Sequence, residues 1–201
     1  DTKISQSTSF PYYFNLDIDK ELTLTPVFEY GGGINSSQRF LFDYNHLLSG
    51  GILNLDLSLD TTLENENNES WLKDGSIVTS YKQNINQNYN IIIESALQTS
   101  RDYIKTTDPT NSLSYNTSLA STIDLNGYNV IKDNDSLRLN LATYQAIAGN
   151  EDNKTMPTVL PFINLASGQE IMKGLNYNNT YELYNIFRDK STTEHSQTQK
   201  K

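Results

Sequence analysis

The feature that most constrains this chain is a strict alternation of apolar and polar residues. It is clearest in residues 53–60, where four leucines alternate with Asn54, Asp56, Ser58 and Asp60. Successive side chains of a β-strand point to opposite faces, so the pattern predicts a strand with one apolar and one polar face. A packed core on the polar side would bury unpaired carboxylates, and water on the leucine side would leave an aggregation-prone surface. One face must therefore meet an apolar environment and the other an aqueous one.

The same alternation in residues 10–30 predicts a β-hairpin at the start of the sheet. Two alternating runs flank the charged corner Lys20-Glu21, and each strand carries a proline, Pro11 or Pro26. Proline has no backbone N–H to donate to a neighbouring strand, so it is confined to strand starts, edges and bulges. We therefore expect this hairpin to lie at a weakly bonded seam.

Alternating runs continue along most of the chain. They predict further strands at residues 40–44, 53–63, 76–82, 89–98, 113–125, 137–141, 156–165 and 177–187. About ten strands at intervals of about 20 residues are too widely spaced for a small sandwich and fit the long hairpins of an outer-membrane barrel. The predicted fold class is all-β, an antiparallel transmembrane β-barrel.

The composition limits the partners and the kinds of membrane segment that are possible. The chain has 201 residues, a formal net charge of −9 and no basic cluster. Nucleic-acid binding needs clustered Lys and Arg to neutralise phosphates, so no nucleic-acid partner is expected. Cysteine is absent, which excludes disulfides and thiolate metal sites. No run of about 18 apolar residues occurs, which excludes a transmembrane helix, whereas membrane β-strands need only about 9–11 alternating residues.

No combination of residues points to catalysis. The two histidines, His46 and His195, stand in unrelated contexts, so a catalytic triad or a histidine metal site has almost no support. Asp133-Asn134-Asp135 resembles the start of a calcium loop, but the Gly and Glu that such a loop requires do not follow. We interpret it as a turn, and we expect no enzyme activity, no metal and no cofactor.

Five acidic residues fall on the polar faces of neighbouring predicted strands. They are Asp17, Asp19, Asp43, Asp56 and Asp60. In one interpretation they form a solvated wall, because a polar interior is general to outer-membrane barrels. In the other they line an acidic lumen that repels or orients a phosphorylated ligand.

The opening stretch also resembles a known family. The residues PYYFNLDIDKELTLTP, at positions 11–26, closely resemble the start of the barrel in the LptD family of lipopolysaccharide-assembly outer-membrane proteins, also called organic solvent tolerance proteins. In that family a PYYFN segment is followed by an LTLTP-like segment, with prolines 15 residues apart, as Pro11 and Pro26 are here. Weaker matches follow in order at Arg101-Asp102-Tyr103, at SLRLNLATYQ (136–145) and at MPTVLPFINL (156–165).

The resemblance implies a barrel of about 26 strands, at the large end of such barrels, of which this chain would contribute about ten. It implies a lipoprotein plug of the LptE type and a periplasmic jellyroll domain that receives lipopolysaccharide from bridge proteins. The barrel would release the lipid sideways into the outer leaflet of the bacterial outer membrane, between its first and last strands. Pro11 and Pro26 match the gate prolines of the family, and no other gate residue is carried over.

The expected organisation has three parts. Residues 1–9 are expected to be a leader or linker, residues 10–188 the first strands of an outer-membrane barrel, and residues 189–201 a polar tail. We expect the jellyroll and the later strands that the resemblance implies to lie outside this sequence, as in a split-gene product or a fragment.

Two alternatives to the family interpretation remain. One is an independent small outer-membrane barrel that serves as a pore or adhesin, which would need its first and last strands to pair despite the prolines. The other is a soluble β-sandwich that serves as a binding module, which would need its leucine rows to pack on one another.

Overall fold

The computed structural model of this chain describes residues 5–31, 37–62, 72–147 and 152–189. Its strands are β1 (Ser5–Ser9), β2 (Tyr12–Asp17), β3 (Lys20–Gly31), β4 (Ser37–Leu48), β5 (Gly51–Thr62), β6 (Leu72–Asn84), β7 (Tyr89–Gln98), β8 (Ser118–Tyr128), β9 (Asp135–Ala146), β10 (Thr158–Met172) and β11 (Leu175–Phe187). Short helices lie in the connections: α1 (Tyr103–Thr107), η1 (Ser112–Tyr115) and η2 (Asn153–Thr155).

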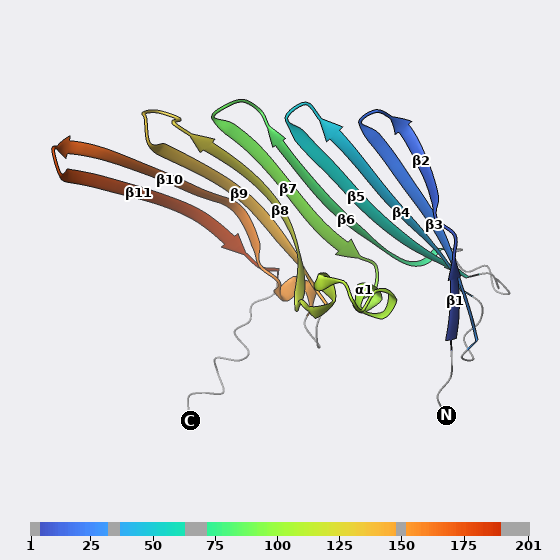
Figure 1. Ribbon diagram of the computed structural model, residues 1–201. Helices are drawn as coiled ribbons and strands as arrows, with labels where there is room; N and C mark the ends of the chain where they lie inside the picture. Colours follow the sequence, from blue (N-terminus) through green and yellow to red (C-terminus); the bar gives the residue numbers. More distant parts are fainter. Residues whose placement is uncertain (1–4, 32–36, 63–71, 148–151, 190–201) are drawn as a thin grey trace, which may run out of the picture. The chain divides into compact units, whose positions relative to one another are not determined.

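The described strands are antiparallel neighbours in a sheet of 11 strands (Figure 1). Their order is β1-β3-β4-β5-β6-β7-β8-β9-β10-β11, and β2 also pairs with β3. The order does not return to β1, so the described strands form an open sheet. The expected all-β, antiparallel class is confirmed.

The chain divides into two compact units. The first comprises residues 1–81 and 95–115, and the second comprises residues 82–94 and 116–201. The first unit thus contains β1 to β5, most of β6, α1 and η1. The second contains β8 to β11 and η2.

In the first unit, the register of the strands sorts apolar and polar side chains onto two faces. On one face Tyr44 of β4 lies opposite Leu55 of β5, and on the other Arg39 lies opposite Asp60. The two-residue turn Ser49-Gly50 fixes this register, and Gly50 has a φ of 83°, a conformation that glycine adopts without strain.

The second unit is sorted in the same way. Leu139 of β9 lies between Leu125 of β8 and Ile163 of β10. On the opposite face, Arg138 Nε donates a hydrogen bond to Asp124 Oδ1 at 2.8 Å. The alternation read from the sequence therefore describes both units.

Buried apolar side chains are few among the described residues. They are Ala96, Tyr103, Ile104, Leu119, Ala142 and Ala146. Large apolar side chains on the strands are mostly half-buried or exposed, and Tyr181 and Leu183 of β11 are each 63% exposed. Among the described residues, neither unit therefore has a core of interlocked large side chains.

Part of the segment expected to be a leader or linker forms a strand. Ser5–Ser9, within the segment expected to be a leader or linker, forms β1 and pairs with residues 27–31 of β3. The remainder of that segment, residues 1–4, lies outside the described residues. Of the polar tail expected at residues 189–201, only Asp189 is described.

One difference from the expected strands lies between β7 and β8. The strand expected at residues 113–125 was wrong at its start, because residues 112–115 form η1 and β8 begins at Ser118. Leu113 and Tyr115 have the spacing of an alternating pair in a strand, but a 3₁₀ turn does not place such residues on one face as a strand does.

No helix among the described residues is long and apolar enough to cross a membrane.

Candidate functional site

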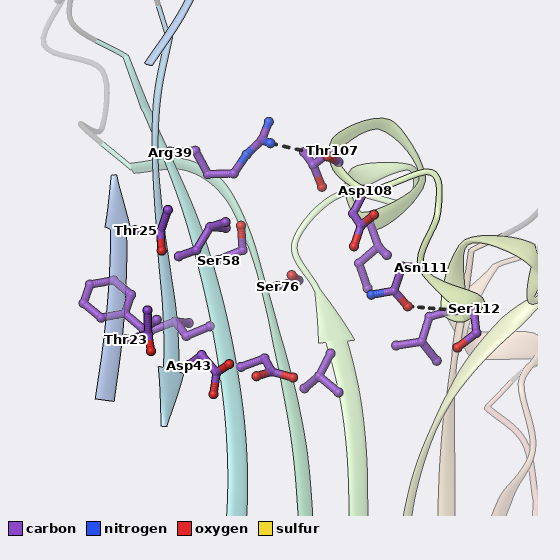
Figure 2. A pocket seen from close by; sticks show the side chains of 17 residues that line it. Thr23, Thr25, Arg39, Asp43, Ser58, Ser76, Thr107, Asp108, Asn111 and Ser112 are labelled. Carbon is purple, nitrogen blue, oxygen red and sulfur yellow. Dashed lines mark hydrogen bonds between the residues drawn. The ribbon is translucent and has the colours of Figure 1, made fainter. Parts of the chain in front are cut away.

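A cavity of about 720 Å³ lies within the first unit, on the polar face of the sheet. Strands β3 to β6 form its floor, and residues 104–113, in the connection between β7 and β8, form the opposite wall. Figure 2 shows the side chains of the two sides across this space, with Thr23, Thr25, Asp43, Ser58 and Ser76 on the strands and Thr107, Asp108, Asn111 and Ser112 opposite.

Strand register builds the acidic part of the floor. Thr23 of β3, Asp43 of β4 and Asp56 of β5 lie side by side in one row across the strands. Asn45 Nδ2 donates a hydrogen bond to Asp43 Oδ1 at 2.7 Å. Like charges directly opposite each other in a sheet are destabilising. Both side chains are exposed to solvent, which weakens their repulsion.

A second part of the floor is organised by Arg39, whose side chain is only 12% exposed. Its Nε donates to Asp60 Oδ1 at 2.7 Å, and its Nη2 lies 3.2 Å from Glu29 Oε1. Its Nη1 donates to the carbonyl of Thr107 at 3.4 Å, the contact drawn across the cavity in Figure 2. Arg39 therefore joins β3, β4 and β5 to the overlying connection. A guanidinium with so little exposure to solvent needs this balance of charge and hydrogen bonds.

Tyr103 of α1 completes this network from the other side. Its side chain is buried, and its hydroxyl donates to Asp60 Oδ1 at 2.9 Å and lies 2.7 Å from Ser58 Oγ. Burial raises the pKa of Tyr103 to about 12, so the hydroxyl keeps its proton at neutral pH. Asp60 thus accepts hydrogen bonds from both Arg39 and Tyr103.

The five acidic residues singled out in the sequence fall into two groups. Asp43 and Asp56 line the cavity, and Asp60, on the same face of β5, accepts a hydrogen bond from Arg39. Asp17 and Asp19 lie at the turn between β2 and β3, away from this row.

The pairing of the first strands with β3 lacks a backbone hydrogen bond at Pro26. The N–H of Phe10 donates to the carbonyl of Pro26 at 3.2 Å. In an antiparallel sheet the N–H and C=O of one residue point to the same side, and opposite residues exchange two hydrogen bonds. Pro26 accepts one of these bonds and has no N–H with which to return the other.

Pro11 weakens the neighbouring position of the same edge. It interrupts the edge between β1 and β2, which pair with β3 on either side of Pro26. Backbone polar groups of successive strand residues point to opposite sides of the strand. The N–H of Phe10 points toward β3, so the N–H that Pro11 lacks would have pointed to the free side of this edge. We call this region, residues 9–12 opposite residues 24–27, the proline seam.

Sequence reasoning did not single out Arg39, Ser58 or Tyr103 as site residues. The register of the β4–β5 hairpin could have found the pairing of Arg39 with Asp60, because both are the same number of residues from its turn. No alternation surrounds Tyr103, and Asp60 is 43 residues away in sequence. Only the folded structure brings this tyrosine to the network.

The chemistry available in the cavity is that of carboxylates and hydroxyls. Among the residues that the structure describes, no group of three or more His, Asp or Glu side chains is placed to hold a metal ion. Neither the models of protein families nor the curated proteins contain a match to this chain.

Proposed function

We propose that this protein is part of a laterally opening β-barrel that assembles lipopolysaccharide into the outer leaflet of the Gram-negative outer membrane. It acts without covalent catalysis. Its partners are lipopolysaccharide, membrane lipid, an LptE-type lipoprotein plug and periplasmic bridge proteins. The observation that carries the proposal is a two-faced sheet whose first strands lack one hydrogen bond at Pro26 and, at Pro11, a backbone donor on the free edge.

The two faces support a location in a membrane. Strands β4 and β5 have 12 residues each, enough for the roughly 9–11 residues that a tilted strand needs to cross the hydrocarbon core. Among the described residues, no packed core covers their leucine and aromatic face. The chains of membrane lipids would cover such a face. Their other face carries Asp43, Asn45 and Asp60, which suit a watery interior.

Single cysteines along β5 test this orientation, because the native chain has no cysteine. Cysteines at Leu53 and Leu55 should react only with probes dissolved in the lipid phase. Cysteines at Asn54 and Asp56 should react only with aqueous probes. Reaction of all four positions with aqueous probes would contradict the membrane location. Protection of the two leucine positions in a detergent-free particle would favour the sandwich alternative.

The proline seam supports sideways release. A barrel wall can part only where the bonds between neighbouring strands are few, since each hydrogen bond contributes about 1 kcal/mol net. Pro26 removes a bond between the first strands, and Pro11 removes a donor from their free side. A lipid that leaves the interior sideways would pass most easily beside such an edge.

Replacing Pro26 by Val restores the missing N–H and tests the seam. The variant should slow hydrogen exchange at the Phe10 amide, because the pair of residues would then exchange both bonds. It should also slow the arrival of newly made lipopolysaccharide at the surface of cells that depend on this protein. The rate can be followed by labelling surface lipopolysaccharide after induction of the variant.

The matched control is Leu24→Val, which changes a side chain on the same face of β3 and adds no backbone donor. It should leave both rates close to those of the native protein. A Pro26→Val variant that protects the Phe10 amide but delivers lipopolysaccharide at the native rate would show that the seam is not the exit.

A further inference from the structure

The connection between β7 and β8 packs against the polar face of its own unit. Residues 99–115, here called the inner segment, contain α1 and η1 and form one wall of the cavity. Two of its side chains, Tyr103 and Ile104, are 3% and 4% exposed. An ordinary surface connection between strands buries no large side chains, so this one has a specific resting place on the sheet.

The half of the inner segment that contains α1 is bonded to the strands. Tyr103 reaches Asp60 and Ser58, and the carbonyl of Thr107 accepts from Arg39. The start of the segment is also tied down, because Thr99 Oγ1 donates to Asp74 Oδ1 at 2.6 Å. All of these contacts lie within the first unit.

The half that contains η1 spans the cavity without such ties. In the described part of the chain, the hydrogen bonds of residues 109–114 are made among themselves and with Asp108, as in Ser114 Oγ to the Asp108 carbonyl at 2.7 Å. Leu113 lines the cavity opposite the strands. The inner segment therefore has one attached half and one half that covers an open space.

We infer that the inner segment is a gate on the polar face, held closed over the cavity by the hydroxyl of Tyr103. This hydroxyl joins the inner segment to two partners on one strand, Ser58 and Asp60 of β5. The inference rests on the proposed function in one respect: the polar face is taken as the watery interior. In its closed position the inner segment narrows the watery space beside Asp43 and Asp56, which line the cavity.

The gate can be tested with a cysteine beneath it. Ser76 of β6 lines the cavity, so Ser76→Cys reports how often water-soluble maleimide enters it. In the full chain in lipid vesicles, adding Tyr103→Phe keeps the ring and removes both hydrogen bonds. One of these bonds is to a carboxylate, so the labelling rate should rise about tenfold or more.

Tyr115→Phe is the matched control. It makes the same chemical change within the inner segment, at a side chain that is 79% exposed, and should leave the labelling rate unchanged. Equal labelling rates in the Tyr103→Phe and Tyr115→Phe variants would overturn the inference.

A second variant guards against misfolding. Ser58→Ala leaves Tyr103 and its bond to Asp60 in place and should raise labelling by only about threefold, as expected for one neutral bond. Thr61→Cys, 8% exposed on the opposite face, should stay unreactive in folded variants. If Thr61→Cys becomes reactive in the Tyr103→Phe variant, that variant has misfolded, and the labelling rate of the Ser58→Ala variant decides the outcome. A labelling rate in Ser58→Ala equal to that of the native protein would also overturn the inference. These labelling rates require no lipopolysaccharide, so they stand or fall separately from the transport proposal.

Discussion

Arginine in place of Leu55 should destabilise the protein in a lipid bilayer by about 2–4 kcal/mol, because the proposed membrane location puts this cation on the lipid face near the middle of the bilayer. Leu55 lies on the apolar face of β5, opposite Tyr44, and no side chain of a packed core surrounds it. The free energy of unfolding from lipid vesicles, measured by urea titration, gives the comparison.

The neighbouring residue supplies the control, because Asn54→Arg places the same side chain on the polar face. Its cost should be within about 1 kcal/mol. Arginine at Leu53, closer to the turn at Ser49-Gly50, should cost less than at Leu55, since the penalty falls toward the membrane surface. Equal penalties at Leu53, Asn54 and Leu55 would contradict a lipid-facing leucine row.

The strands could be predicted because their two faces carry different kinds of side chain. Alternation at residues 53–60 and the turn at Ser49-Gly50 together determine which residues of β4 and β5 are opposite each other. β7 begins and ends at the predicted residues, 89 and 98, although its faces are less distinct. A physical constraint that acts on every second residue can be recognised from a single sequence, because it produces a regular alternation of residue types.

The inner segment could not be predicted in this way. α1 has five residues, too few for a helical period to show in the sequence. It is held by contacts that are distant in sequence, above all Tyr103 with Asp60. Leu113 and Tyr115 even continue the alternation of the following strand, so local pattern and tertiary packing disagree there. β1 was missed for a related reason, because the residues Ser-Gln-Ser-Thr-Ser carry no apolar face and form a strand only through pairing with β3.

Arg39→Met should destabilise the first unit by about 3 kcal/mol. Arg39 is 12% exposed and its partner Asp60 is 17% exposed, with 2.7 Å between Nε and Oδ1. Removing the guanidinium leaves Asp60 and Glu29 without their cation, and breaking a buried ion pair on one side is strongly destabilising. Hydrogen exchange of the amides of β4 and β5 in lipid vesicles measures this loss within the unit.

The matched control is Arg138→Met in the second unit. Arg138 makes the same bond to Asp124, at 2.8 Å, but its side chain is 55% exposed, so solvent screens the pair and the loss should stay below about 1 kcal/mol. Adding Asp60→Leu to Arg39→Met removes a stranded charge and should restore part of the lost stability, although Tyr103 then loses its acceptor. If Arg39→Met and Arg138→Met cost the same, burial does not strengthen the Arg39 pair. The inner segment would then be held by its tyrosine and its packing rather than by the charge network beneath it.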